Sequence, residues 1–444
     1  MTPFFPRLFS SCLMLWTCAG MAGPLSVDSS QGKLVAGKPQ TFYLKVAVTV
    51  PEDGPEKATQ TPLNVALVLD NSGSMQGERI DYARRAALSF VERLQTRDRL
   101  ALVTFSEQAE VRYPSTQNVD KTKLRAIIGK IRDDAYTALY DGVETGAGQV
   151  AEHLSKAQLN RVVLLSDGEA NIGPSSPQEL AELGRGLAKK GISVTTVGLG
   201  ESYNEELMMK LAAASDGNHV FARNAAQLEG IFGAEFDDAR AVVARDAQFD
   251  IQLQPGVEPV RVYGYDSEIK GQDIKVKIPQ LRGGQEKYVI VEAKTSPGSA
   301  MDKLPLAKVG LAYQSMNGET VKAQVDSQAE LVHDEKAAVA SANPAVMEKA
   351  MLQVGTAQNE QALQAISRGD VAKGKQLLKD NAVMLERNAE ILNSKELKSI
   401  GEQTRSYEKM ASEPVRESEL KKSMSQDVYN QKTQKVFKSS ASTP

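Results

Sequence analysis

Four short apolar runs in the first half of the chain constrain its fold more than any other feature. They read NVALVLD (64–70), RLALVTF (99–105), RVVLLSD (161–167) and ISVTTVGLG (192–200). Continuous apolar runs of this length are typical of strands that are buried on both faces, as in parallel sheets. Because parallel strands need long crossover connections, the segments between these runs should be helices.

The intervening segments have the periodicity of helices. In RIDYARRAALSFVERL (79–94) the apolar residues form one stripe at helical spacing, with charges on the opposite face. A second helix should begin at the cap Ser176, followed by Pro177, and end at Gly191. This alternation predicts an α/β domain over residues 61–236 with a doubly wound, mostly parallel sheet.

A period of two appears on both sides of this domain. Apolar residues alternate over 247–253, 274–278 and 309–313, with turn sequences between them, which predicts an antiparallel β-sandwich over 237–335. Residues 42–48 alternate in the same way, before the Pro- and Gly-rich linker PEDGPEKATQTP. We therefore expect the α/β domain to be inserted in the sandwich, with residues 23–60 supplying the linker and the missing strands.

The last quarter of the chain should be helical. Residues 336–412 have helical spacing and predict a bundle or hairpin, in which the triplet Arg368-Gly369-Asp370 is read as a helix end. Its role is open between docking to a partner and simple stabilisation. Residues 413–444 are polar and Ser-rich, and predict a flexible tail.

The first 22 residues resemble an export signal. Arg7 precedes an apolar run that is too short to span a bilayer, and Gly20 and Ala22 suit a cleavage site after Ala22. A lipoprotein signal with Cys18 as the lipidated residue is the alternative. Both cysteines, Cys12 and Cys18, lie in this segment, so the mature chain should contain no disulfide. The predicted location is periplasmic, secreted or at the cell surface, with no transmembrane segment.

Charge and motifs exclude several functions. The 53 basic and 56 acidic side chains give a net charge of −3, which offers no electrostatic case for nucleic-acid binding. The three histidines, His153, His219 and His333, are far apart, and neither a Walker motif nor a His-Glu-x-x-His motif is present. We therefore predict that the protein is not an enzyme.

Two aspartates follow strands that should flank the crevice of the sheet. With the strand order 3-2-1-4-5-6, Asp70 ends the first strand and Asp167 the fourth, while Ser72 and Ser74 lie on the adjoining loop. Oxygen ligands of this kind suit Mg²⁺, with Mn²⁺ or Ca²⁺ possible, and do not suit zinc. Two carboxylates only balance the charge of a dication and leave no excess negative charge. An acidic group of a partner could therefore bind as a further ligand. The alternative is that these residues cap helices or form turns.

The sequence DNSGSM resembles the Asp-x-Ser-x-Ser signature of von Willebrand factor type A domains, which forms a metal-ion-dependent adhesion site. Thr137 in AYTALYDG resembles the threonine of that family, and Asp167 in LLSDGEAN resembles its second aspartate. The resemblance implies direct metal contacts from Ser72, Ser74 and often Thr137, and contacts through water or hydrogen bonds from the aspartates. The arrangement looks most like bacterial secreted relatives of calcium-activated chloride channel regulators and inter-alpha-inhibitor heavy chains. It departs from the family pattern at Asp133–Tyr136, where glycines are frequent, and this predicts an acidic mouth.

We therefore expect an extracytoplasmic protein that uses a site of Asp70, Ser72, Ser74, Thr137 and Asp167 to bind a divalent cation. That cation would capture an acidic group of a protein or peptide partner. The alternative is a structural component of the cell envelope, in which the metal only stabilises the fold and the helical segment mediates assembly.

Overall fold

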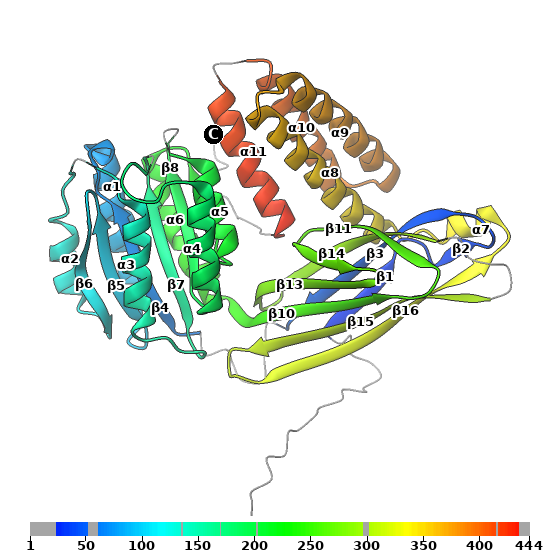
Figure 1. The fold of residues 1–444 in the computed structure, drawn as a ribbon, viewed down its shortest axis with the longest axis horizontal. Helices are drawn as coiled ribbons and strands as arrows, with labels where there is room; N and C mark the ends of the chain where they lie inside the picture. The colour runs from blue at the N-terminus through cyan, green and yellow to red at the C-terminus, as the bar shows by residue number, and fades with distance from the viewer. Residues whose placement is uncertain are drawn as a thin grey trace, which may run out of the picture.

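A computed structural model describes residues 24–51, 61–134, 136–168, 170–200, 203–295, 302–413 and 416–434 of the chain. The described residues form an α/β domain, a β-sandwich and a group of C-terminal helices (Figure 1). The predicted signal segment lies outside them, as does most of the predicted linker. No helix in these ranges is long and apolar enough to cross a membrane.

The α/β domain is built on a six-stranded sheet with the order β6-β5-β4-β7-β8-β9. All neighbours are parallel except β6 and β5, which are antiparallel. The strands are β4 (Leu63–Asp70), β5 (Arg99–Phe105), β6 (Ala109–Gln117), β7 (Leu159–Ser166), β8 (Ser193–Leu199) and β9 (His219–Ala222). The predicted fold class and strand order are therefore confirmed, with β6 as the antiparallel member.

Helices cover both faces of this sheet. Alternate residues of β4 belong to two separate cores, since Val65 and Leu67 pack with α1 and α6, whereas Ala66 and Val68 pack with α3 to α5. The helices are α1 (Glu78–Glu92), α2 (Lys121–Ile128), α3 (Leu139–Ala151), α4 (Pro177–Lys189), α5 (Glu205–Ala214) and α6 (Leu228–Arg240), with short 3₁₀ turns η1 (Gly73–Met75) and η2 (Ala225–Gln227). Burial on both faces explains the unbroken apolar runs of the sequence.

The sandwich contains strands from both sides of the α/β domain. One sheet has the order β1-β3-β14-β11 and the other β12-β13-β10-β15-β16-β2. The strands are β1 (Leu25–Ser29), β2 (Lys33–Val35), β3 (Gln40–Thr49), β10 (Val242–Leu253), β11 (Val257–Tyr263), β12 (Ser267–Lys270), β13 (Asp273–Arg282), β14 (Glu286–Thr295), β15 (Lys303–Ser315) and β16 (Thr320–Val332). Because β3 lies between β1 and β14, the α/β domain is inserted in the sandwich, as expected.

Buried polar side chains join the α/β domain to the sandwich. Arg161, at the start of β7, is 1% exposed and donates hydrogen bonds to Glu235 of α6 (3.4 Å) and Gln280 of β13 (2.9 Å). Arg282 of β13 donates to Asp238 of α6 at 2.5 Å. This network fixes the end of the α/β sheet at which β7 begins against the sandwich.

The C-terminal helices are α7 (Glu335–Ala340), α8 (Pro344–Ser367), α9 (Val371–Leu392), α10 (Lys395–Met410) and α11 (Glu417–Lys432). They attach to the sandwich mainly through α8, which packs on the outer face of the four-stranded sheet, whereas α7 lies against β2 and β16 of the other sheet. Ala350 and Met351 of α8 share a core with Ala47, Tyr288 and Ile290 of the sheet. The sandwich thus covers apolar side chains of α8 in this helical segment.

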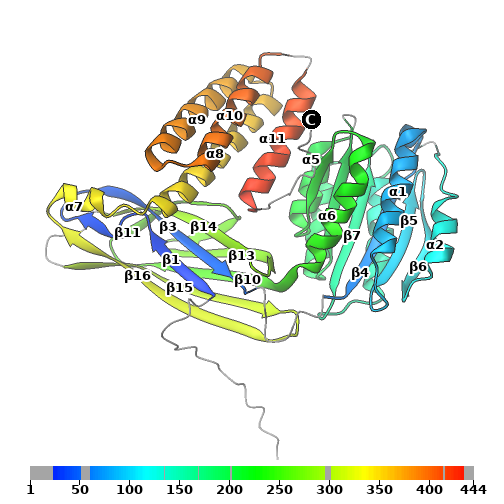
Figure 2. The ribbon, with the colours of Figure 1, turned by 180° about the vertical axis from the view of Figure 1, so that it is seen from behind.

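Helix α11 corrects the prediction of a flexible tail over 413–444. It lies between the helices α8–α10 and the side of the α/β domain that carries α5 (Figures 1 and 2). Leu420, Met424, Val428 and Tyr429 are buried at helical spacing, and this supplies the packing that the polar composition concealed. Residues 435–444 lie outside the described residues.

Two glutamine side chains of the C-terminal segment bind sheet edges. The Gln426 amide accepts a hydrogen bond from the Phe221 N–H (2.7 Å) and donates to the His219 carbonyl (3.0 Å), on the edge strand β9. The Gln434 amide accepts from the Tyr288 N–H and donates to the Tyr288 carbonyl, both at 3.0 Å, where β14 extends beyond β11. Each side-chain amide thus makes the two backbone hydrogen bonds that a neighbouring strand would make.

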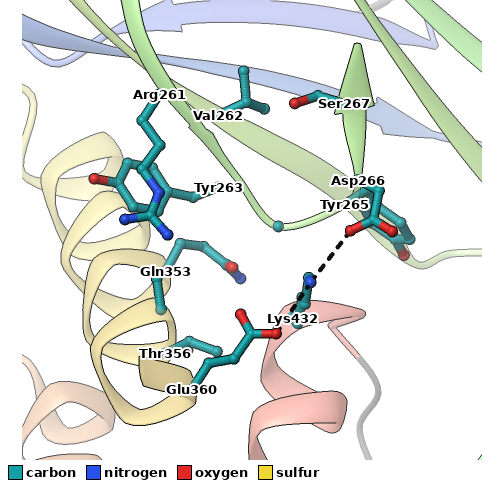
Figure 3. Close-up of a pocket in the computed structure, with 12 residues that line it drawn as sticks. Arg261, Val262, Tyr263, Tyr265, Asp266, Ser267, Gln353, Thr356, Glu360 and Lys432 are labelled. Carbon is teal, nitrogen blue, oxygen red and sulfur yellow. Dashed lines mark ion pairs between the residues drawn. The ribbon is translucent and has the colours of Figure 1, made fainter. Parts of the chain in front are cut away.

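The end of α11 also closes a small polar cavity of about 260 Å³ (Figure 3). Lys432 lies between two carboxylates, 3.3 Å from Asp266 and 3.5 Å from Glu360. The ion pairs connect α11 to the sandwich and to α8. This cavity lies on the sandwich side of α11, apart from the strand ends of the α/β sheet.

Candidate metal centre

Asp70 lies at the carboxyl end of β4, where the parallel pairing with β7 brings Ser166 alongside. The Ser166 hydroxyl donates a hydrogen bond to Asp70 Oδ2 at 2.5 Å, and the Ser72 N–H donates to Asp70 Oδ1 at 2.8 Å. Asp70 is 0% exposed. The carboxylate is therefore fixed by its own loop and by the neighbouring strand.

The loop after β4 directs two hydroxyls toward the end of β7. The Ser72 and Ser74 hydroxyl oxygens lie 3.0 Å apart, and Ser74 donates to Asp167 Oδ1 at 2.6 Å. The buried side chain of Met75 holds the 3₁₀ turn of this loop in the core. Helix α1 begins only after Gly77 and has no side-chain cap, so Ser74 does not cap it.

Thr137 reaches the same place from the loop before α3. Asn171 holds its backbone: the Asn171 side chain accepts from the Thr137 N–H (2.9 Å), and the Asn171 N–H donates to the Thr137 carbonyl (3.1 Å). A Cβ atom added to Gly168 would lie 3.3 Å from Ser74 Oγ and 3.5 Å from Thr137 Oγ1. The two hydroxyls thus border one small space, which a side chain at position 168 would crowd. Ala138, not Thr137, is the N-cap of α3.

The electrostatics of the two aspartates favour a cation. Burial raises the pKa of Asp70 to about 6, and the nearby negative charge of Asp167 acts in the same direction. Hydrogen bonds from Ser166 and Ser72 oppose this rise in the pKa. Ionised carboxylates buried this closely are costly unless positive charge compensates them.

These five side chains fit a hard divalent cation. They supply carboxylate and hydroxyl oxygens, which suit Mg²⁺ or Mn²⁺, and they leave room for further oxygen ligands. No group of three or more His, Cys, Asp or Glu side chains in the described ranges forms a metal-binding cluster. The candidate centre therefore depends on its serine and threonine hydroxyls.

Three further residues support the centre and were not predicted from the sequence. Ser166 binds Asp70, Asn171 holds Thr137, and Arg79 of α1 forms an ion pair with Asp167 Oδ2. Ser166 and Asn171 lie in the run LLSDGEAN that contains Asp167, and their closeness to Asp167 in the sequence could have indicated a role at the site. The contact of Arg79 depends on how α1 crosses the sheet.

Of the acidic residues predicted to line the entrance of the site, Asp134 pairs with the loop after β4. Its N–H donates to the Asn71 carbonyl at 2.7 Å, and its carboxylate accepts from Ser106 at 3.1 Å. Asp134 is exposed beside the loop that carries Ser72 and Ser74. A carboxylate at this position adds negative charge near the centre.

His219 belongs to the core of the domain. It is 1% exposed, and its Nδ1 lies 2.9 Å from the Thr196 hydroxyl. It lies on β9, away from the strand ends that carry Asp70 and Asp167.

Comparisons with known proteins agree with this architecture. YfbK of Escherichia coli (strain K12) is 26% identical over 231 residues, which cover 51% of this chain and 40% of YfbK. The inter-alpha-trypsin inhibitor heavy chain H3 of Rattus norvegicus is 30% identical over 181 residues, which cover 38% of this chain and 20% of that protein. The chain thus spans less than half the length of either relative.

A solved structure resembles nearly the whole chain. The von Willebrand factor type A protein from Catenulispora acidiphila has a TM-score of 0.67 and 15% identity, covering 93% of this chain and 97% of its own. At this identity the likeness concerns the fold. The model of the von Willebrand factor type A domain matches residues 64–234, the segment that carries all five candidate ligands. Residues 64–234 therefore belong to the von Willebrand factor type A domain family.

Proposed function

We propose that this protein binds a protein or peptide partner through a divalent cation held by Asp70, Ser72, Ser74, Thr137 and Asp167. The observation that carries the proposal is that the Ser74 and Thr137 hydroxyls meet beside Gly168, with Ser72 and the buried Asp167 in contact with Ser74 and the buried Asp70 fixing the same loop. Domains of this family commonly mediate metal-dependent protein interactions. Mg²⁺ is the proposed ion, and an acidic group of the partner is its proposed external ligand.

The chain's own residues would orient this interaction. Ser72, Ser74 and Thr137 would present their hydroxyls, while Asp70 holds the loop by accepting from the Ser72 N–H and Asp167 holds the Ser74 hydroxyl. The bound cation supplies the positive charge that attracts a carboxylate. We propose a binding role rather than an enzymatic one, and a location outside the cytoplasm, because of the apolar run that precedes Ala22.

Replacing Asp70 tests the proposal. Asp70→Ala removes a carboxylate from the cation's surroundings, so metal should no longer stabilise the domain. For the wild type, metal at a hundredfold excess over its dissociation constant should add about 2.7 kcal/mol to the free energy of unfolding. Thermal melting with Mg²⁺ or with chelator measures this difference, and a pull-down from envelope extract under the same conditions measures partner capture.

Asp326→Ala is the matched control, because Asp326 is an exposed carboxylate on β16 of the sandwich. It should keep both the metal response and partner capture. If the wild type ignores metal in melting and in capture, the proposal is wrong. Metal stabilisation without metal-dependent capture would favour the structural alternative, in which the helical segment mediates assembly.

A further inference from the structure

Arg79 is a cationic side chain placed directly against the candidate centre. It lies in the first turn of α1 and is partly exposed, with a side-chain exposure of 38%. Its Nη1 atom contacts Asp167 Oδ2 and donates to the Ser74 carbonyl at 3.3 Å. A Cβ atom on Gly200, at the end of β8, would lie 3.6 Å from Arg79 Nη2. The guanidinium therefore lies at the rim, over the ends of β7 and β8.

The position of this arginine is unfavourable for the helix itself. The first turn of a helix carries partial positive charge, which favours acidic side chains, and Glu78 and Asp81 satisfy that preference in α1. Asp167, whose side chain is 0% exposed, gives Arg79 its compensating contact. The two oxygens of Asp167 have different partners, since Oδ1 accepts from Ser74 and Oδ2 from Arg79.

We propose that Arg79 lowers the cation affinity of the centre and couples cation binding to capture of an acidic group. This inference rests on the proposed function. A guanidinium on Asp167 repels a dication held by the same aspartate and weakens the attraction of that carboxylate for it. By thermodynamic reciprocity, the cation also weakens the contact between Arg79 and Asp167.

A displaced guanidinium remains at the exposed rim beside the cation. Its planar fork of N–H donors matches a carboxylate, so one acidic group can reach both the cation and Arg79. A ligand that binds Arg79 keeps the guanidinium away from Asp167, for which it competes with the metal. A carboxylate should therefore strengthen metal binding more in the wild type than in a variant without the guanidinium.

The test compares Mn²⁺ binding by the full chain carrying Arg79→Gln, Arg79→Lys or no substitution. Calorimetric titration should give a dissociation constant about tenfold lower for Arg79→Gln than for the wild type, with Arg79→Lys between them. Acetate, added as the carboxylate, should tighten Mn²⁺ binding by a larger factor in the wild type than in Arg79→Gln. Arg85→Gln is the control, because Arg85 is an exposed residue of the same helix that stacks on Tyr82.

Melting in chelator keeps the test informative if a variant is less stable. In chelator, Arg79→Gln should melt at a lower temperature than the wild type, because Asp167 loses the guanidinium that pairs with it. Added Mn²⁺ should raise the melting temperature of Arg79→Gln by more than that of the wild type. If the wild type binds Mn²⁺ and Arg79→Gln binds it no more tightly, this inference is wrong and the proposed function stands. If neither the wild type nor any variant binds Mn²⁺, the proposed function falls and this inference falls with it.

Discussion

Gly168 is the residue whose small size matters most at the candidate centre. It follows Asp167 directly, and its missing side chain leaves the space between the Ser74 and Thr137 hydroxyls clear. An alanine there would place a methyl group 3.3 Å from Ser74 Oγ, which is tighter than an ordinary contact.

We predict that Gly168→Ala weakens metal binding by about tenfold, or about 1.4 kcal/mol, because the methyl group displaces the two hydroxyls. Titration with Mn²⁺ measures the change. Gly148→Ala is the control, since a Cβ there has no neighbour within 4 Å and an alanine suits the interior of α3. Equal affinities for the two variants would contradict the prediction.

At the residue scale, the sequence predicts which candidate ligands lie together better than it predicts the residues that support them. Asp70 and Asp167 could be proposed as partners because Asp70 ends one buried strand and Asp167 follows another, and parallel strands end at the same edge of a sheet. Arg79 could not, because its contact depends on the rotation of α1 over the sheet and on the reach of a long side chain. Positions next to strand ends are set by topology, whereas such contacts are set by packing.

At the scale of elements, α11 shows how composition conceals a helix. Its buried apolar residues are diluted by polar neighbours, and two of its polar side chains are also buried or paired in the interface. Lys422 is 3% exposed, lies 3.2 Å from Glu205 and 4.8 Å from the centre of the Tyr203 ring, and Gln426 binds β9. A polar sequence thus forms an interface helix because its partners are tertiary and distant in sequence.

We predict that Gln426→Ala loosens α11 from β9. The substitution leaves the Phe221 N–H and the His219 carbonyl without their amide partner, which should cost about 1–3 kcal/mol. Hydrogen exchange at the Phe221 amide should accelerate accordingly. Gln376→Ala, on the exposed face of α9, should leave that exchange rate unchanged; an unchanged rate in Gln426→Ala would argue against the contact.

The contact between α10 and α11 should respond to pH. Burial raises the pKa of Asp427 above its usual value of 3.8, although a hydrogen bond from Tyr407 opposes the rise. The folded state then binds this proton more tightly than the unfolded state, so ionisation of Asp427 lowers stability as the pH rises above 3.8.

Asp427→Asn removes that ionisation and keeps an oxygen that accepts from Tyr407. The variant should match the wild type near pH 3 and melt at a higher temperature at pH 7. Melting temperatures measured across this range test the prediction, and a difference that does not change with pH would refute it.

At the scale of the whole molecule, the sandwich depends on strands that precede the α/β domain. Strand β3 pairs with β14 from Gln40 to Thr49 and buries Phe42, Leu44 and Val46 in the core. The alternation of residues 42–48 made this strand predictable, whereas β1 was less evident. Which strand β3 pairs with could not be predicted from the sequence, because the pairing with β14 depends on the path of the chain in three dimensions.

We predict that residues 241–332 alone do not fold, because β14 would lose β3 and the core would lie open. A chain that joins residues 24–51 to 241–434 through a short linker should fold. A short linker suffices because the two ends to be joined, near Val50 and Ala241, lie close together. Their carbonyls accept hydrogen bonds from two consecutive residues, Val50 from the Gly284 N–H and Ala241 from the Gly283 N–H. Dispersed NMR spectra should appear for the joined chain only; dispersion from the 241–332 fragment would refute the prediction.

The network at Arg161 has a mechanical consequence. Arg161 is the third residue of β7 and Asp167 directly follows the strand, so the six residues from Arg161 to Ser166 span about 20 Å between the sandwich and the candidate centre. A pull on a partner held at Asp167 would travel along the strand axis. The hydrogen bonds that join β7 to β4 and β8 would then be loaded together in shear, instead of opening one by one. Part of the load would reach the sandwich through the hydrogen bond from Arg161 to Gln280, beside the contact of Arg282 with Asp238 and the direct connection from α6 to β10.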